Sequence, residues 1–172
     1  MDNRELQKLT AKKMLQIGYT DKIFFKMSRY YHVLGMVLDA FVVIITALLT
    51  AVLYLRNTPE TVNIGLAIMA SIISFFNTFV NFEKRALEFE NAGDAYNSLL
   101  KEFRDFYSLE LTGQDNTNGK AMERFEQLSS RQRELNELTP ATSDLIARRV
   151  KHEEVMQSIE VQEGELRPLL ED

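Results

Sequence analysis

Two long runs of apolar residues dominate the middle of the chain. They cover residues 33–55 and 62–82 and are separated by a short polar connection that contains Pro59. A run of about 20 apolar residues is long enough to cross a hydrocarbon core of roughly 30 Å as a helix. A short connection with a proline favours a tight turn between antiparallel neighbours. The pattern therefore predicts a transmembrane helical hairpin over residues 33–82 and argues against an ordinary soluble globular enzyme.

The residues before the hairpin, 1–32, are expected to form cytoplasmic helices. Gly18 is the expected end of a first helix, and Thr20 with Asp21 would cap a second helix that runs into the first span. Apolar positions spaced three and four apart continue through this second helix, which is typical of a coiled-coil seam. This first seam consists of Phe24, Met27, Tyr31, Leu34 and Leu38.

A second seam follows the hairpin. Because neither Pro nor Gly lies between Val80 and Gly93, the second span is expected to continue as one helix to about Leu109, with residues 83–111 as its cytoplasmic extension. The apolar positions of this extension again repeat at spacings of three and four: Phe89, Ala92, Tyr96, Leu99, Phe103 and Phe106. We expect the two seams to pack on each other and to hold copies of the chain together as a homo-oligomer.

The remainder of the chain also has a helical pattern. Residues 112–119 have the composition of a loop. Residues 120–158 are expected to form a C-terminal helical region, which Pro140 interrupts and Asp144 restarts. Acidic residues dominate 159–172, which we expect to be a solvated tail. The whole pattern predicts an all-α integral membrane protein with a two-helix hairpin, long cytoplasmic helical extensions and coiled-coil-like packing.

Charge is distributed unevenly along this pattern. Residues 33–82 carry one basic and two acidic residues, whereas 112–172 carry eight basic and thirteen acidic ones. A net charge of -5 with an acidic C-terminal third argues against nucleic-acid binding, which depends on a basic face. The basic residues near the spans are Lys22, Lys26, Arg29, Lys84 and Arg85 on the side of the termini, and Arg56 in the connection. By the positive-inside rule, both termini are expected to be cytoplasmic.

Residue types that carry catalysis or bind metals are scarce. The chain has no cysteine and two histidines, and neither histidine has a second ligand at metal-binding spacing. No glycine-rich phosphate loop and no nucleophile elbow is present in the sequence. We therefore expect no catalytic site, metal or cofactor. His32 stands beside Tyr30 and Tyr31 at the membrane boundary, where an interfacial anchor is the favoured reading and a pH sensor the alternative.

Asp39 is the ionisable residue that lies inside the first span. It stands six residues from the start of that run, where a charge costs several kcal/mol unless it faces protein or water. For an antiparallel pair with the turn centred between Thr58 and Pro59, facing residues have numbers that sum to about 117. This register places Asn77 and Thr78 at the level of Asp39, where either could form a hydrogen bond to it.

Each span also carries a stripe of small or hydroxyl side chains. The stripes consist of Gly35, Thr46 and Thr50 in the first span, and Ala67, Ser71, Ser74, Thr78 and Asn81 in the second. One interpretation is plain packing, because small residues let membrane helices approach closely. The other is that several hairpins surround a water-filled path lined by Asp39 and these polar residues, which would favour cations. A two-span hairpin is too small to enclose a path alone, so this second interpretation requires an oligomer.

Several stretches near the end of the second span carry a resemblance. They are Phe79-Val80-Asn81-Phe82-Glu83-Lys84-Arg85-Ala86, Phe89-Glu90-Asn91-Ala92, Tyr96-Asn97-Ser98-Leu99 and Glu102-Phe103, with Gln132-Arg133-Glu134-Leu135-Asn136-Glu137-Leu138-Thr139-Pro140 later in the chain. Together with a basic aromatic helix before the first span, they resemble the SLATT family over roughly residues 15–155. These are two-transmembrane effector domains of prokaryotic conflict systems, associated with nucleotide-sensing proteins. The resemblance implies a domain that forms pores or perturbs membranes when a sensor signals.

Two functional classes therefore remain open. In the first, the protein is an oligomeric pore-forming effector that receives its signal from a separate sensor protein, since residues 1–172 hold no recognisable sensor domain. In the second, it is a structural anchor or scaffold that holds a coat or capsid layer on a cellular or virion membrane. The scaffold would use the surface of residues 120–158 as its binding face and would not require Asp39 to be ionised. Asp39 matches no motif of the family that the chain resembles.

Overall fold

All the regular structure in the described part of the chain is helical. The computed structural model describes residues 3–54, 59–111, 118–142, 144–148, 150–151 and 155. The elements are α1 (Asn3–Tyr54), α2 (Glu60–Val80), α3 (Phe82–Asp105), the π-helix η1 (Phe106–Leu111), α4 (Asn118–Leu138) and α5 (Asp144–Ala147). They form two compact units, residues 28–87 and residues 1–27 with 88–172, here named the hairpin and the bundle. The all-α prediction is confirmed for these residues.

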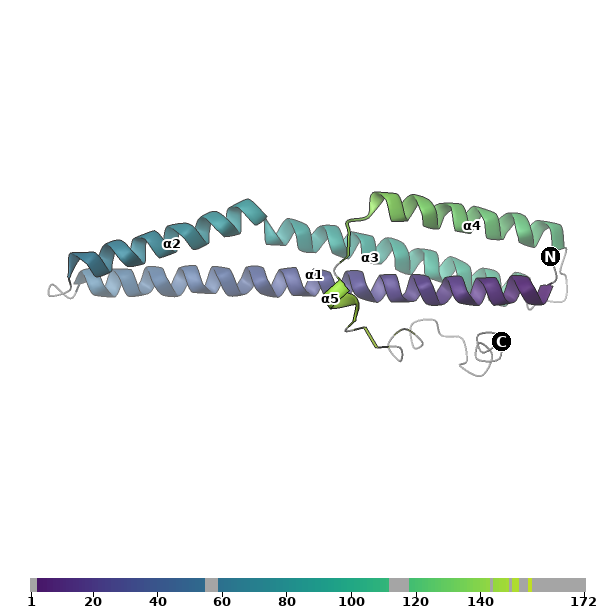
Figure 1. Cartoon of the computed structure of the whole chain (residues 1–172), viewed down its shortest axis with the longest axis horizontal. Helices are drawn as coiled ribbons and strands as arrows, with labels where there is room; N and C mark the ends of the chain where they lie inside the picture. Colours follow the sequence, from purple (N-terminus) through teal and green to yellow (C-terminus); the bar gives the residue numbers. More distant parts are fainter. Residues whose placement is uncertain are drawn as a thin grey trace. The chain divides into compact units, whose positions relative to one another are not determined.

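The hairpin pairs the second half of α1 with α2, which run side by side (Figure 1). The less exposed positions of each helix repeat at spacings of three and four, as expected for a seam between two helices. They are Leu34, Leu38, Val42, Ile45, Leu49 and Val52 on α1, and Asn63, Leu66, Ala70 and Ile73 on α2. At the turn, the amide of Val62 donates to the carbonyl of Pro59 at 3.0 Å, and α2 begins at Glu60.

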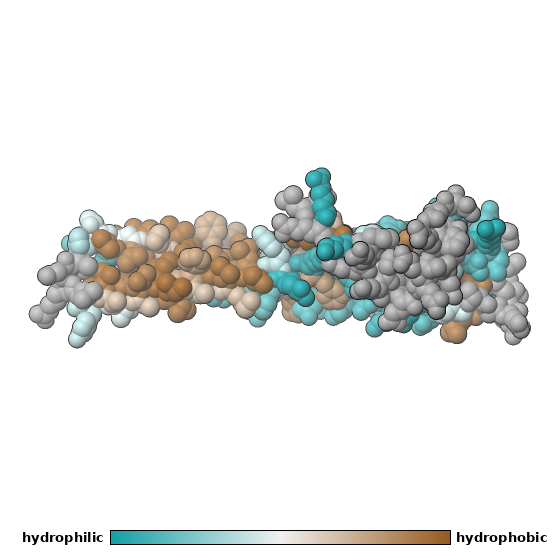
Figure 2. All heavy atoms as spheres, turned by 90° about the horizontal axis from the view of Figure 1, so that it is seen from below, coloured by the Kyte–Doolittle hydropathy of each residue, from teal (hydrophilic) through white to brown (hydrophobic). Residues whose placement is uncertain are grey.

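The outer surface of the hairpin is apolar. Figure 2 shows hydrophobic side chains covering most of its visible face. Two helices are long and apolar enough to cross a membrane, and only 6% and 0% of the residues in their most apolar stretches are buried. The core helix of a soluble protein would instead bury most of such a stretch. Exposed apolar patches of this extent mark a surface that contacts lipid or another protein.

The expectation of one uninterrupted helix from the second span to Leu109 is wrong at Asn81. α2 ends at Val80, Asn81 has a left-handed φ of 47°, and α3 begins at Phe82. Asparagine tolerates this conformation better than other residues with a side chain, apart from glycine. Its carboxamide Oδ1 accepts a hydrogen bond from the amide of Lys84 at 3.1 Å, and its carbonyl accepts one from the amide of Arg85 at 3.1 Å. Asn81 therefore both ends α2 and caps α3.

The bundle is built from the first half of α1, from α3 with η1, and from α4. The predicted helix end at Gly18 is wrong, because α1 continues through this buried residue, and Thr20 Oγ1 donates back to the carbonyl of Gln16 at 2.9 Å. A glycine inside a helix costs only about 1 kcal/mol relative to alanine. The burial of Met14 and Ile17 before it and Phe24 after it offsets that cost.

The two predicted seams meet inside the bundle. The rings of Phe24 and Phe89 lie 6.1 Å apart between centroids, and those of Phe24 and Tyr96 lie 5.4 Å apart. Gly93 of α3 lets the two helices approach closely at this level, because a Cβ at Gly93 would lie 3.2 Å from three ring atoms of Phe25 on α1. α4 completes the core by packing Phe125 against Phe103, with ring centroids 6.3 Å apart.

The C-terminal part is less helical than predicted. α4 begins at Asn118, two residues before the expected start, and ends at Leu138 just before Pro140. α5 ends at Ala147, and Val150 and Lys151 are not helical, whereas Val155 is helical, so the expected continuous helix from 144 to 158 is interrupted at 150–151 among the described residues. The amide of Val150 donates to the carbonyl of Ala147 at 3.1 Å, three residues earlier, which is the tightened bond that often closes the last turn of a helix. Of the predicted loop at 112–119, residues 118 and 119 instead begin α4, and residues 112–117 lie outside the described residues, as does the predicted tail at 159–172.

Candidate functional site

The polar residues predicted inside the spans lie on the surface of the hairpin. Asp39, Thr46 and Thr50 of α1 are exposed, as are Ser71, Ser74 and Thr78 of α2. We name these six residues the polar flank. Asn81 is exposed too, but it serves as the cap of α3. The side chain of Asn77, the other predicted neighbour of Asp39, lies outside the described residues.

Most hydroxyl groups of the polar flank bond to their own helices. Four of the five donate to the carbonyl four residues earlier: Thr46 to Val42 at 2.7 Å, Thr50 to Thr46 at 2.9 Å, Ser71 to Ala67 at 2.8 Å, and Thr78 to Ser74 at 3.0 Å. This bond satisfies the hydroxyl hydrogen without water. The oxygen lone pairs that remain can still accept a hydrogen bond from a ligand, a water molecule or another helix.

Both rows of the polar flank face the same side of the hairpin. Every flank residue except Thr78 follows a less exposed seam residue by one position, as Thr46 follows Ile45 and Ser74 follows Ile73, and Thr78 stands four residues after Ser74 on the same face of α2. One position is about 100° of helix rotation. In two antiparallel helices, the same rotation away from the shared seam leads to the same side of the pair. Asp39 and Thr78 line one pocket, which agrees with this geometry.

That pocket is a concave feature at one end of the hairpin. Its volume is about 410 Å³, and it is lined by His32, Gly35, Met36, Asp39, Thr78, Asn81, Phe82 and Glu83. The register predicted from the sequence placed Asp39 level with Thr78, and both line the pocket. The same register applies to Gly35 and Phe82, since a Cβ at Gly35 would lie 3.2 Å from Phe82 Cβ. The pocket adds His32 and Glu83, which the sequence did not connect with Asp39.

Negative charge dominates the lining of this pocket. Asp39 and Glu83 contribute carboxyl groups from α1 and α3, and His32 contributes an imidazole. Neither lysine nor arginine lines it, and the nearest basic residues in the sequence are the exposed Lys84 and Arg85. Within the described residues, no three His, Asp or Glu side chains converge closely enough to hold a metal ion. The arrangement can attract a cation, and it holds no serine, threonine or lysine paired with a base as a nucleophile would require.

The predicted oligomer seam is used within one chain. Phe24, Met27, Phe89, Tyr96, Leu99, Phe103 and Phe106 are each at most 3% exposed. Tyr31 is half-buried and packs on Phe82, with ring centroids 6.2 Å apart. These side chains build the fold of a single chain, so contacts between copies would require a different surface.

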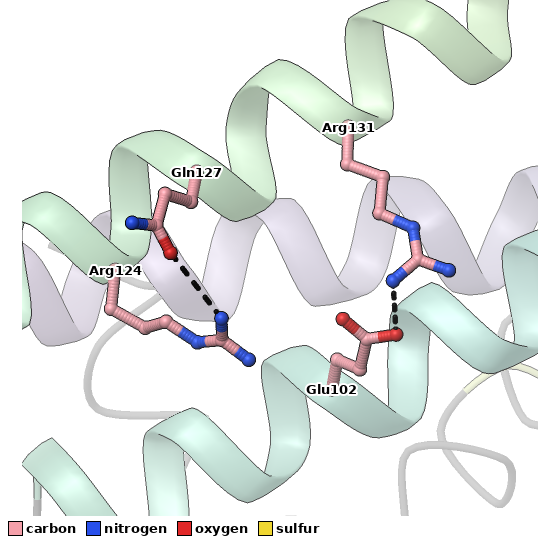
Figure 3. Close-up of polar contacts among 4 residues, drawn as sticks. All are labelled: Glu102, Arg124, Gln127 and Arg131. Atoms are coloured by element: carbon pink, nitrogen blue, oxygen red, sulfur yellow. Dashed lines mark hydrogen bonds and ion pairs between the residues drawn. The ribbon is translucent and has the colours of Figure 1, made fainter.

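Polar contacts join the helices of the bundle. Lys13 Nζ donates to Gln132 Oε1 at 2.8 Å, and the hydroxyl of Tyr96 donates to Asn136 Oδ1. Burial raises the pKa of the Tyr96 phenol. On the outer side, Arg131 of α4 forms an ion pair with Glu102 of α3, and Arg124 donates to Gln127 Oε1 at 3.3 Å (Figure 3). The first three of these contacts hold α4 against α1 and α3, and the contact between Arg124 and Gln127 lies within α4.

Asp21 is a fully buried acidic residue in the bundle. Its side chain is 1% exposed, and neither carboxyl oxygen has a well-oriented hydrogen bond within the described structure. Burial raises its pKa above the ordinary value of 3.8, and the charge of Lys22, whose Nζ lies 3.3 Å from Oδ2, lowers it in part. The nearby Asp94 adds to the upward shift. The sequence assigned Asp21 only a capping role.

Comparison of the chain with protein-family models, with curated proteins and with solved structures found no match. The argument for function therefore depends on the hairpin, its polar flank and its pocket.

Proposed function

We propose that the protein crosses a lipid bilayer twice through its hairpin, with both termini on the cytoplasmic side. α2 has 21 residues, which at a rise of about 1.5 Å each span roughly 30 Å, the thickness of a hydrocarbon core. The exposed apolar surface of the hairpin is explained if lipid covers it. The excess of basic residues beside the terminal ends of the spans supports this orientation.

The polar flank supports an oligomer. Asp39 lies about 9 Å along the helix from the start of the apolar run, where an ionised carboxylate facing lipid would cost about 3 kcal/mol. The serine and threonine side chains of the polar flank gain no favourable interaction from contact with lipid. Copies of the chain that turn their polar flanks toward one another would remove Asp39 from lipid. The flank is available for this contact because it is exposed, whereas the bundle seams are already filled.

The function that this geometry supports best is a cation-favouring path between hairpins. A ring of Asp39 carboxylates attracts cations, and hydroxyl rows line the path above it. The resemblance to the SLATT family supports the same function, an effector that permeabilises a membrane when a separate sensor protein signals. The observation that carries the proposal is the exposure of Asp39 on one polar side of an otherwise apolar hairpin.

The test is ion flux from liposomes that contain the wild type or Asp39→Asn at matched protein density. We expect the wild type to admit cations, as reported by a cation-sensitive dye trapped inside the liposomes, and the variant to conduct less or with weaker cation preference. Glu60→Gln serves as the matched control, because Glu60 is an exposed acidic residue at the other end of α2. Equal flux and selectivity in all three proteins would contradict a role of Asp39 in conduction.

A structural anchor is the second candidate, and one observation favours it. The hydroxyls of Thr46, Thr50, Ser71 and Thr78 already donate to their own helices, so close packing of hairpins without water leaves these four hydroxyl hydrogens satisfied. In this case the exposed charged face of α4 would bind a structural partner. Absence of flux from well-folded oligomers, together with specific recovery of a coat or capsid protein through α4, would favour the anchor.

A further inference from the structure

We propose that the pocket at the end of the hairpin binds the primary ammonium group of a phospholipid headgroup. This inference depends on the membrane placement proposed above, but it does not depend on conduction. Its volume of about 410 Å³ lies within the range of about 300–1,000 Å³ that is usual for ligand pockets. The pocket extends from His32, just before the apolar run, to Asp39, about 9 Å inside it, so its outer end lies at the depth of the headgroups.

The charges of the lining select a cation. Asp39 and Glu83 supply two carboxyl groups from different helices, while Thr78 supplies hydroxyl lone pairs beside them. An ammonium group has three donors and no acceptor, so this set of acceptors suits it. Charge-assisted hydrogen bonds of this kind are about twice as strong as neutral ones.

The spacing of the acidic groups favours an organic cation over a metal ion. His32, Asp39 and Glu83 line the same pocket, yet these three side chains do not converge as metal ligands. A ligand with several atoms can reach groups on both sides of a pocket where one ion cannot. A primary ammonium should bind better than the quaternary ammonium of a choline headgroup, which has no N–H to donate. Phe82 is the single aromatic side chain in the lining, whereas quaternary groups are usually held by several.

The residues next to the pocket complement the rest of such a headgroup. Lys84 and Arg85 follow Glu83 in the first turn of α3, and both are exposed. A phospholipid with a primary ammonium carries its phosphate two carbons away. Carboxylates inside the pocket and basic residues beside it therefore match the two charges of the zwitterion. This complementarity favours a lipid headgroup over a free amine.

The test measures which lipid stays with the protein. The wild type is reconstituted with equal amounts of phosphatidylethanolamine and phosphatidylcholine, extracted in mild detergent, and the bound lipids are counted by mass spectrometry. We expect phosphatidylethanolamine to be enriched about tenfold, the ratio that one charge-assisted hydrogen bond provides. Glu83→Gln and Asp39→Asn, which change the pocket from two different helices, should both return the ratio toward one. Glu60→Gln, far along α2 from the pocket, should retain the enrichment.

Three results would overturn the proposal. The first is equal recovery of the two lipids by the wild type. The second is enrichment that persists in both pocket variants. The third is that soluble phosphoethanolamine, added to the wild type in phosphatidylcholine micelles, stabilises it against heat as much as phosphatidylethanolamine does. That result would assign the pocket to a free amine. Flux from liposomes is recorded separately, so loss of conduction with retained enrichment contradicts only the proposed path.

Discussion

Gly35 on α1 and Phe82 on α3 approach so closely that a Cβ at Gly35 would lie 3.2 Å from Phe82 Cβ. A larger side chain at this position must push the helices apart, which typically costs 1–3 kcal/mol, of order 2 kcal/mol here. We expect Gly35→Leu to lower the thermal stability of the hairpin in detergent. Gly65→Leu is the matched control, because a Cβ at Gly65 meets no atom within 4 Å. Equal stability of the two variants would show that the close approach does not exist.

The bundle provides a test of where the predicted seam residues are used. Leu99 is 0% exposed and Leu109 is 74% exposed, although both belong to the segment that follows the hairpin. An aspartate at Leu99 would bury an unpaired charge, so we expect Leu99→Asp to unfold the bundle. Leu109→Asp should leave it folded. Circular dichroism and limited proteolysis distinguish these outcomes. A folded Leu99→Asp protein that only loses its oligomeric state would instead support the seam as a contact between chains.

Asp21 is expected to make the stability of the bundle depend on pH. Burial raises its folded-state pKa above 3.8, so the folded state holds this proton more tightly than the unfolded state does. The stabilisation is fully present below the unfolded pKa, and it is lost as the pH rises through the raised folded pKa. At neutral pH the bundle therefore contains a buried carboxylate with Lys22 as its main partner and Asp94 opposing it.

Asp21→Asn removes this ionisation. We expect the variant to be more stable than the wild type at pH 7 by about 1–3 kcal/mol and to lose the decline in stability with rising pH. Thermal unfolding followed at several pH values measures both effects. Asp105→Asn is the control, because Asp105 is an exposed residue of α3 in the same unit. This assignment would be contradicted if both the wild type and Asp105→Asn became more stable as the pH rises from 4 to 7.

Asn81 should be sensitive to substitution for two separable reasons. An alanine there loses the cap to Lys84 and also adopts a positive φ, so Asn81→Ala should cost about 2 kcal/mol. Asn81→Gly keeps the conformation and loses only the side-chain bond, so it should cost less. Thermal unfolding of the three proteins should rank them Asn, Gly, Ala in decreasing stability. Alanine as stable as asparagine would argue for an unbroken helix through this position.

Much of the fold could be predicted because periodicity reports which face of a helix is covered. The apolar runs, the proline turn and the seam from Phe89 to Phe106 all follow from residue spacing alone. The break at Asn81 could not be predicted from a search for glycine and proline, since it depends on an asparagine that caps the next helix. The continuation of α1 through Gly18 depends on tertiary packing on either side, which outweighs the local helix propensity.

The candidate site was predictable only in part. The antiparallel register placed Asp39 level with Thr78, because it needs only the position of the turn. Glu83 and His32 lie beyond the ends of the two apolar runs. His32 lies about two turns before Asp39 on the same helix, whereas the approach of Glu83 to Asp39 depends on how α3 starts after Asn81. An asparagine followed closely by an acidic residue at the end of a span was the signal that could have indicated this local start.

The central claim is that the polar flank faces water between hairpins, and thiol accessibility tests it most directly. The chain has no cysteine, so single substitutions provide the only reactive sites. In liposomes, a charged membrane-impermeant reagent should modify Thr46→Cys and Ser74→Cys and reduce ion flux. Ile44→Cys and Phe76→Cys should stay unmodified in lipid. Each lies two positions from a flank cysteine, Ile44 from Thr46 and Phe76 from Ser74, which is more than half a helical turn. Flank cysteines that cross-link between copies yet resist the reagent would mean dry packing and would contradict a conducting path.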